Sequence, residues 1–168
     1  MIFEPIEYML KDGRKLILRT ATETDAQEML AFRIKSIGET DFLLQYPEEM
    51  ADYTIEKQLK FMDRMISSEN DKMFTAVVDG KIVGCVMYSK AELVDENGNV
   101  KPIVSMGPIC IHPDYQRRGF SRILLEFTFE LVKEMGYDYV QYSGAYDCIS
   151  AEDLAKANAE AGLTVCGT

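Results

Sequence analysis

Three short turn sequences divide much of this chain into antiparallel hairpins. They are Asp12-Gly13, Asp79-Gly80 and Asn97-Gly98. Each pair stands between segments of alternating or apolar β-forming residues, and such pairs are the strongest short-range signal of a hairpin turn. The sequence therefore predicts strands on both sides of each turn, which begin within residues 7–21 and continue as a meander through residues 72–111.

Two segments between the first and second hairpins have the 3.6-residue apolar period of amphipathic helices. The first helix is expected to begin at a capping box of Thr24 and Gln27 and to end at Gly38. The second follows a loop, residues 37–50, that is broken at Pro47. The apolar faces assigned to the two helices are Ala26, Leu30 and Ile34, and Ile55, Leu59, Met62 and Ile66.

The last third of the chain contains the best-defined helical pattern. This helix is expected to end at Gly136, and a strand within residues 137–144, an alanine-rich helix at 150–162 and a strand at 163–168 follow it. The apolar face of the helix that ends at Gly136 is Phe120, Ile123, Leu124, Phe127, Leu131 and Met135. No linker or repeat interrupts this order, so residues 1–168 are expected to form one α/β domain.

Composition restricts the partners that such a domain could bind. With 168 residues, of which 47% are hydrophobic, the chain can fill one core. A formal net charge of −10, with acids and bases interleaved, argues against nucleic acid, which requires a basic surface. The same charge either maintains solubility or attracts a cationic substrate. No apolar run approaches the roughly 20 residues needed to cross a bilayer, so no membrane association is expected.

The cysteines favour a reduced, metal-free protein. Cys85, Cys110, Cys148 and Cys166 are widely separated, form no C-x-x-C pair and share the chain with a single histidine. Three of them lie on apolar segments and are interpreted as small core residues rather than as zinc ligands or disulfides. A cytoplasmic location follows as the expectation.

The predicted strand at residues 101–111 is interrupted by Gly107-Pro108. Proline has no N–H to donate to a neighbouring strand, so its presence in an apolar strand implies a bulge or a parted neighbour. Backbone groups near Ile109, Cys110 and Ile111 must then bond to water, a side chain or a ligand. An extended ligand that contains amides could pair with them as an added strand would.

Residues 116–121, Gln-Arg-Arg-Gly-Phe-Ser, follow this strand and begin the best-defined helix. A helix start presents unpaired N–H groups and the positive end of the helix dipole, both of which favour an anion. Gly119 and the small Ser121 permit close approach, and Arg117 and Arg118 add positive charge in an acidic protein. An isolated copy of such a turn would be an ordinary helix start. The strand, the break and the helix together favour a pyrophosphate site.

The stretch "HPDYQRRGFSRILL", residues 112–125, resembles the acyl-CoA-binding motif Gln/Arg-x-x-Gly-x-Gly/Ala of the GNAT acyltransferase superfamily. The order of elements from Leu16 to the end is similar too. The resemblance implies an α/β (α+β) fold: a mixed, mostly antiparallel sheet flanked by about four helices, with a splayed strand at the acyl-CoA site. Ser121 departs from the final Gly or Ala of the motif. The resemblance also implies the cofactor-binding residues, which are Ile109, Cys110, Ile111, Gln116, Arg117, Arg118, Gly119, Phe120 and Ser121.

The same resemblance implies an acetyl-CoA-dependent N-acetyltransferase. A primary amine, on a small molecule or a protein, attacks the acetyl thioester within a ternary complex, and the departing thiolate receives a proton. Family members often take that proton from a tyrosine whose position here is held by Asn158. Tyr146 is the preferred substitute and Tyr142 the alternative, and both tyrosines could instead serve only in packing.

A general base is needed, because the acceptor amine has a pKa of about 10.4 and must lose a proton. The sequence defines this base less well than the cofactor site. Glu92 is the candidate base, with Glu39 and Asp41 as alternatives, although each could be an ordinary solvated charge. His112 is expected to serve in the turn rather than in catalysis. Binding of acyl-CoA as a sensor, or binding of another nucleotide phosphate, remains the alternative function. The single strand after residue 162 implies a homodimer that completes the sheet edge or an unusually open acceptor pocket.

Overall fold

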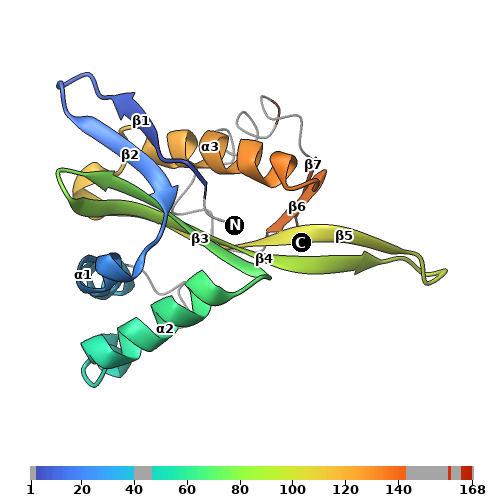
Figure 1. Cartoon of the computed structure of the whole chain (residues 1–168), viewed down its shortest axis with the longest axis horizontal. Coiled ribbons are helices and arrows are strands. Elements are labelled where there is room, and N and C mark those ends of the chain that lie inside the picture. Colours follow the sequence, from blue (N-terminus) through green and yellow to red (C-terminus); the bar gives the residue numbers. More distant parts are fainter. Residues whose placement is uncertain (1–2, 40–46, 143–158, 160–163, 168) are drawn as a thin grey trace.

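A seven-stranded sheet forms the centre of the protein, and its strands lie side by side in chain order (Figure 1). The computed structural model describes residues 3–39, 47–142, 159 and 164–167. Neighbouring strands are antiparallel from β1 to β5, and β5–β6 and β6–β7 are parallel. The strands are β1 (Ile6–Met9), β2 (Lys15–Thr20), β3 (Asp71–Val78), β4 (Lys81–Val94), β5 (Val100–Ile111), β6 (Tyr139–Tyr142) and β7 (Thr164–Gly167). The predicted mixed, mostly antiparallel sheet is confirmed.

All three predicted hairpin turns are present. At the turn between β3 and β4, Asp79 has φ +51° and Gly80 has φ +76°. Positive φ at both central residues matches the right-handed twist of the flanking strands, which is why Asp-Gly is favoured there. This turn therefore fits the β3–β4 pairing that it connects, while the turn at Asn97-Gly98 closes the long β4–β5 arm that extends from the body in Figure 1.

Helices cover both faces of the sheet. Helices α1 (Ala26–Ile37) and α2 (Ile55–Ser67) lie on one face, and α3 (Phe120–Glu134) lies on the other (Figure 1). Alternation along β3 divides the core, since Phe74 packs in the α3 cluster and Met73 in the α1–α2 cluster. Short 3-10 turns occur at Glu23–Asp25, Pro47–Met50 and Pro113–Tyr115. None of the described helices is long and apolar enough to span a membrane.

The start and the buried face of α1 differ from the prediction. The helix follows a 3-10 turn in which the Thr22 N–H donates to the Asp25 carboxylate at 2.7 Å, so Thr22 and Asp25 take the place of Thr24 and Gln27. Ile34 is 48% exposed. The buried residues of α1 are Ala26, Met29, Leu30, Phe32, Ser36 and Ile37. The helix is rotated because its second contact surface is α2, which the sequence period could not reveal.

Helix α2 shows the same kind of rotation. Leu59 is 43% exposed and Ile66 is also exposed, although both were assigned to the apolar face. The buried residues are Gln58, Met62 and Met65. Helix α3 agrees better with its predicted face: four of the six residues are buried, Ile123 and Met135 pack against the core, and Gly136 follows the last turn. The fourth predicted helix lies almost entirely outside the described residues.

A bidentate ion pair connects the first hairpin to α1. Arg19 on β2 donates to both carboxylate oxygens of Asp25, each at 2.6 Å. Burial alone would raise the pKa of Asp25, but the hydrogen bonds from Arg19 and Thr22 outweigh it and hold the pKa below its usual value. The pair is therefore charged at neutral pH.

We predict that Asp25→Asn lowers the free energy of unfolding by about 2–3 kcal/mol, because Arg19 loses its partner in a mostly buried setting. A depressed native pKa stabilises the fold above the pKa of the unfolded chain, and the stabilisation is lost as pH falls through the native pKa. The difference from wild type in urea unfolding should thus be constant near neutral pH and shrink below about pH 4. Glu7→Gln, which removes the exposed pair with Lys15, is the control and should change stability little.

Candidate active site

A β-bulge interrupts β5 at the predicted position. Val86 pairs with Ile109 and Tyr88 with Met106, so Met87 alone lies opposite Gly107 and Pro108. Two residues opposite one define a bulge. Its effect is visible in the core, where Met106 and then Ile109 both pack toward α3, three positions apart instead of two.

Among the described residues, the strand segment after the bulge is paired along one edge only. The His112 N–H donates to the Val83 oxygen at 2.9 Å, which sets the phase of the antiparallel hydrogen bonds with β4. Alternation from this point directs the backbone groups of Ile109 and Ile111 away from β4 and those of Cys110 toward it. The described pairing with β6 stops at Met106–Tyr142. The backbone groups of Ile109 and Ile111 therefore face away from β4, whereas those of Cys110 face β4 and leave only its side chain for other contacts.

A glycine-dependent turn joins this edge to α3. Gly119 is the residue before the helix and has φ +81° and ψ 8°, and Arg117 also has a positive φ of 57°. Within the described part of the chain, no protein group accepts from the N–H groups of Gly119, Phe120 or Ser121. The space where a Cβ on Gly119 would lie is open to 4 Å. The turn therefore presents several N–H groups and the helix dipole to an unobstructed space.

Gln116 connects the turn with the free edge. Its side-chain Nε2 donates to the Ile111 oxygen at 3.2 Å. This bond satisfies one of the exposed carbonyls and holds the turn against the end of β5. The strand edge and the N–H groups of the turn consequently form one continuous polar surface.

Tyr115, an aromatic residue that the sequence analysis did not assign, contacts Arg118 of the turn and Arg14 of the first hairpin. The guanidinium carbon of Arg118 lies 5.8 Å from the centre of the Tyr115 ring, and that of Arg14 lies 5.6 Å from it. Arg14 also donates to the Tyr115 hydroxyl at 3.2 Å and is held by Asp12. Because Arg14 is separated from Tyr115 by 101 positions, only the folded structure brings them together.

A cavity of about 240 Å³ lies on the other side of the bulge, between α1, α2 and the sheet. Pro108 and Met87 form its wall at the bulge, so the cavity begins where the free edge of β5 begins. Its lining is Met29, Phe32, Arg33, Ser36, Ile37, Phe61, Met73, Cys85, Met87, Pro108 and Cys110. The five α1 members are spaced i, i+3, i+4, i+7 and i+8, a helical face that the sequence analysis missed by choosing the adjacent one.

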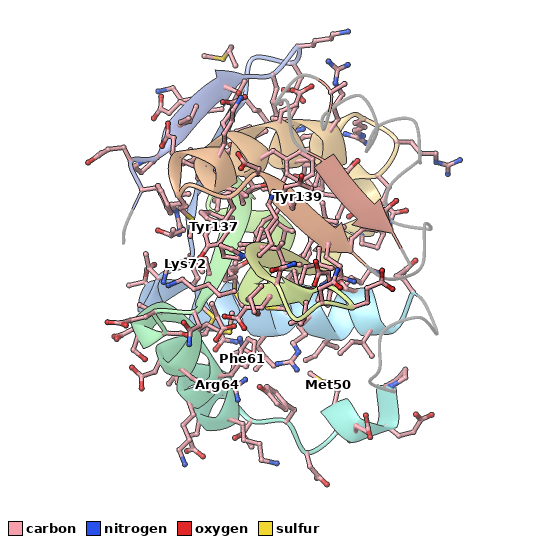
Figure 2. All side chains as sticks on the ribbon, turned by 90° about the vertical axis from the view of Figure 1, so that its right-hand side faces the viewer. Met50, Phe61, Arg64, Lys72, Tyr137 and Tyr139 are labelled. Carbon is pink, nitrogen blue, oxygen red and sulfur yellow. The ribbon has the colours of Figure 1, made fainter. Side chains whose placement is uncertain are left out.

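Arg33 is the one charged residue among the described residues of this lining. Its guanidinium lies over the rings of Tyr53 at 4.6 Å and Phe61 at 5.1 Å, and donates to the Tyr53 hydroxyl at 2.8 Å. Phe61 and Arg64 are both labelled on α2 in Figure 2, and Arg64 lies over the same ring at 5.5 Å. These contacts hold the positive charge of Arg33 at a defined place on an apolar wall.

The two predicted base residues that the structure describes, Glu92 and Glu39, are not part of the cavity lining. Glu92 is exposed and pairs with Pro102 in the outer arm, about 16 Å along the strand from Met87. Glu39 is exposed and lies near Lys35. Tyr146, Asp41 and Asn158 lie outside the described residues. His112 accepts a hydrogen bond from the Asp114 N–H at 3.2 Å, which confirms its role in the turn.

A second cavity lies near the end of α3 and is polar. Lys72 and Tyr137, both labelled in Figure 2, are part of its lining. The Lys72 ammonium donates to the main-chain oxygens of Ser68 and Asp71, so its charge is already engaged. The described lining of this cavity shares no residue with that of the first cavity.

Residues 34–153, well over half of the chain, match the model of the Acetyltransferase (GNAT) family. The chain belongs to the GNAT family. The resemblance inferred from residues 112–125 is thereby confirmed, and the family assignment makes the protein an acetyltransferase.

Solved GNAT structures share this fold. An acetyltransferase of the GNAT family from Streptococcus pneumoniae is 25% identical, with a TM-score of 0.64 over 88% of this chain and 83% of that chain. Aminoglycoside N-acetyltransferase AAC(6')-Iy in complex with CoA is 14% identical, with a TM-score of 0.62 over 92% and 91%. AAC(6')-Ih from Acinetobacter baumannii is 13% identical, with a TM-score of 0.58 over 89% and 90%. No curated protein matches the chain.

The two cysteines of this GNAT cavity should differ in reactivity. Burial raises the pKa of Cys85 to about 12, so at pH 8 it is almost entirely a protonated thiol, whereas Cys110 is half-buried. We predict that iodoacetamide at pH 8 modifies Cys110 in the native protein and modifies Cys85 only after unfolding in urea. Peptide mass spectrometry distinguishes the two sites. Equal native rates would contradict the packing of Cys85 against α1.

Proposed function

We propose that the protein is a cytoplasmic N-acetyltransferase that transfers the acetyl group of acetyl-CoA to a primary amine. The observation that carries this proposal is the continuity of three parts around one bulge. The N–H groups of the α3 turn, the free edge of β5 and the cavity at Pro108 follow one another in space. CoA is a bound ligand of the AAC(6')-Iy structure, which has the same fold.

The residues of the turn suit the pyrophosphate of CoA. Gly119 leaves open space for a phosphate group, and the N–H groups of residues 119–121 are free to donate to it. Arg117 and Arg118 are exposed beside these donors and supply positive charge. They oppose locally the net charge of −10, which would otherwise repel the phosphates.

The free edge of β5 suits the pantetheine arm. The arm contains two amides, and the outward backbone groups of Ile109 and Ile111 can pair with them as an added strand would. The side chains of both residues are buried toward α3, so they hold the edge in place without obstructing it. In this arrangement the thioester end reaches Pro108 and the cavity.

Acetyl-CoA supplies an acetyl thioester. The protein must position an amine against it, accept a proton from the amine and provide a proton to the sulfur. The nitrogen forms a bond to the acetyl carbon as the bond from carbon to sulfur breaks, the amine loses a proton, and the sulfur gains one. We assign the Ile109 N–H, which faces away from β4, to stabilise charge on the thioester oxygen. Tyr146 is the proposed proton donor to the sulfur. The described cavity lining contains no carboxylate or histidine, so the proposed path for the amine proton leads to water.

Gly119→Glu should abolish measurable CoA binding, because the side chain would put bulk and negative charge into the phosphate space. Isothermal titration with desulfo-CoA measures the loss. Gly98→Glu is the matched control, since Gly98 also has φ +81° and open space but lies in the β4–β5 turn. Wild-type affinity in Gly119→Glu would refute the assigned phosphate site.

Tyr146→Phe should lower kcat for acetyl transfer by about 10²-fold and leave the affinity for CoA unchanged, as expected for a lost general acid. Thiol release with a panel of amines measures the rate. Tyr142→Phe is the comparison, because Tyr142 ends β6 and packs against the core. An unchanged kcat in Tyr146→Phe would remove this residue from the mechanism. CoA binding without turnover of any amine would instead favour an acyl-CoA-binding module.

A further inference from the structure

We propose that Cys85 and Cys110 form a redox-active pair, which a small hydroperoxide converts into a disulfide between β4 and β5. The pair itself does not depend on the proposed acetyl transfer, because it concerns only two side chains and the strands that carry them. Three features of the described chain support it: the register of the two strands, the cavity wall that both thiols share and their unequal burial.

The two cysteines lie directly opposite each other on neighbouring antiparallel strands. The register of β4 and β5 pairs Cys85 with Cys110. The His112 N–H donates to the Val83 oxygen, so the pair two positions further along is again a hydrogen-bonded one. In such pairs the Cα atoms are about 5.5 Å apart, within the roughly 4.4–6.8 Å that a disulfide spans. The backbone therefore already places the two residues at a distance that a disulfide can bridge.

Both thiols face the same side of the sheet. Residues directly opposite each other in an antiparallel pair point to one face, and both side chains line the cavity between α1 and α2. They also share one apolar cluster, in which Cys85 is buried and Cys110 is a partly buried neighbour. Both are thiols in the structure. Oxidation would therefore require no change of side-chain face, only a closer approach of the two sulfur atoms.

The bulge lies next to this pair and gives the strands room to adjust. Only the Val86–Ile109 pair separates the cysteines from Met87 and the two residues opposite it. The Cβ atoms of opposite residues are about 4.5–5.5 Å apart and those of a disulfide about 3.5–4.5 Å, so the bond draws them together by about 1 Å. A bulge already interrupts the regular ladder here. A strained bond of this kind is easily reduced, which suits a reversible disulfide rather than a structural one.

The unequal burial of the cysteines sets the order of the reaction. Cys110 is half-buried, so a reagent as small as hydrogen peroxide can reach it. Cys85 is 7% exposed, and burial raises the pKa of its thiol to about 12. Because the thiolate is the nucleophile, Cys110 reacts first and Cys85 acts as the resolving thiol.

The oxidation consumes one peroxide for each disulfide. The Cys110 thiolate attacks one peroxide oxygen, the bond between the two oxygens breaks, and Cys110 becomes a sulfenic acid as hydroxide leaves. The Cys85 sulfur then attacks the Cys110 sulfur, and the bond from sulfur to oxygen breaks. The departing hydroxide takes the Cys85 proton and becomes water. The two thiols lose two electrons in total, and the peroxide is reduced to two waters.

Peptide mapping of the native protein tests the bond. Trypsin places the four cysteines on four different peptides, residues 82–90, 91–117, 134–156 and 157–168. After brief treatment with hydrogen peroxide and alkylation of the remaining thiols in urea, we expect peptides 82–90 and 91–117 to be joined. Dithiothreitol should separate them. No joining, or joining of either peptide to one of the other two in place of this pair, would overturn the proposal.

Cys85→Ala is the matched variant, because alanine keeps a small apolar side chain in the buried position and removes the resolving thiol. Cys110 should still form a sulfenic acid, which dimedone traps. It should then proceed to the irreversible sulfinic acid about tenfold or more faster than in wild type, where the neighbouring thiol intercepts it. Equal rates in the two proteins would contradict a resolving role of Cys85. The wild-type peptide map decides the question even where this variant fails to fold.

The bond should also act on the proposed CoA site, and this step rests on the proposed function. Cys110 lies between Ile109 and Ile111, so drawing it toward β4 moves the edge that is proposed to pair with pantetheine. We expect the oxidised protein to bind desulfo-CoA about two- to tenfold more weakly, equivalent to one weakened hydrogen bond. Dithiothreitol should restore the affinity.

Titration of both redox forms with desulfo-CoA separates the two proposals. Equal affinity of the reduced and oxidised forms would reject the effect of the bond on the CoA site. Failure of the reduced protein to bind desulfo-CoA would refute the proposed function, while the peptide map would still decide whether Cys85 and Cys110 form the pair.

Discussion

The site depends on one backbone irregularity, the bulge that sets Gly107 and Pro108 opposite the single residue Met87. Pro108 has no N–H group to donate to a neighbouring strand, which favours a bulge at this point. The extra residue changes which side chains face α3, and Ile109 and Ile111 remain in that core after the bulge. Their backbone groups therefore stay on a rigid strand while facing away from β4. A flexible loop could offer the same groups but would have to be ordered on binding.

The bulge also connects two regions of different chemistry. On one side, the α3 turn presents N–H groups and arginines to an anion, within a protein whose net charge is −10. On the other, Pro108 closes the wall of an apolar cavity that contains Arg33. In the proposed function, CoA and the acceptor amine would thus reach the bulge from opposite directions. The separation keeps the phosphate charges away from the cavity, where a low dielectric would make any charge costly.

Features that depend on neighbouring residues could be predicted well. The Asp-Gly and Asn-Gly turns, the apolar face of α3 and the break at Gly107-Pro108 are each specified within a short window. The faces of α1 and α2 were only partly right: Ala26, Leu30 and Met62 are buried as predicted, but each helix packs on the other as well as on the sheet, which shifts the rest of the buried face. Ile34 and Leu59 are exposed for this reason. The sequence placed Glu92 on the correct strand. Its distance from Met87 could not be predicted, because it depends on how far the β4–β5 arm extends.

The amino-acid sequence by itself determined the order of the elements, the hairpin registers and the motif of residues 116–121, because glycine and proline restrict the backbone wherever they occur. Only the tertiary structure decided which side chains meet. Arg14 reaches Tyr115 through the twist of the first hairpin, and Phe61 reaches Arg33 through the packing of α2 on α1. The physical reason is that turn and bulge geometry is local, whereas a cavity is bounded by elements far apart in the chain, and their relative positions come from packing the whole core.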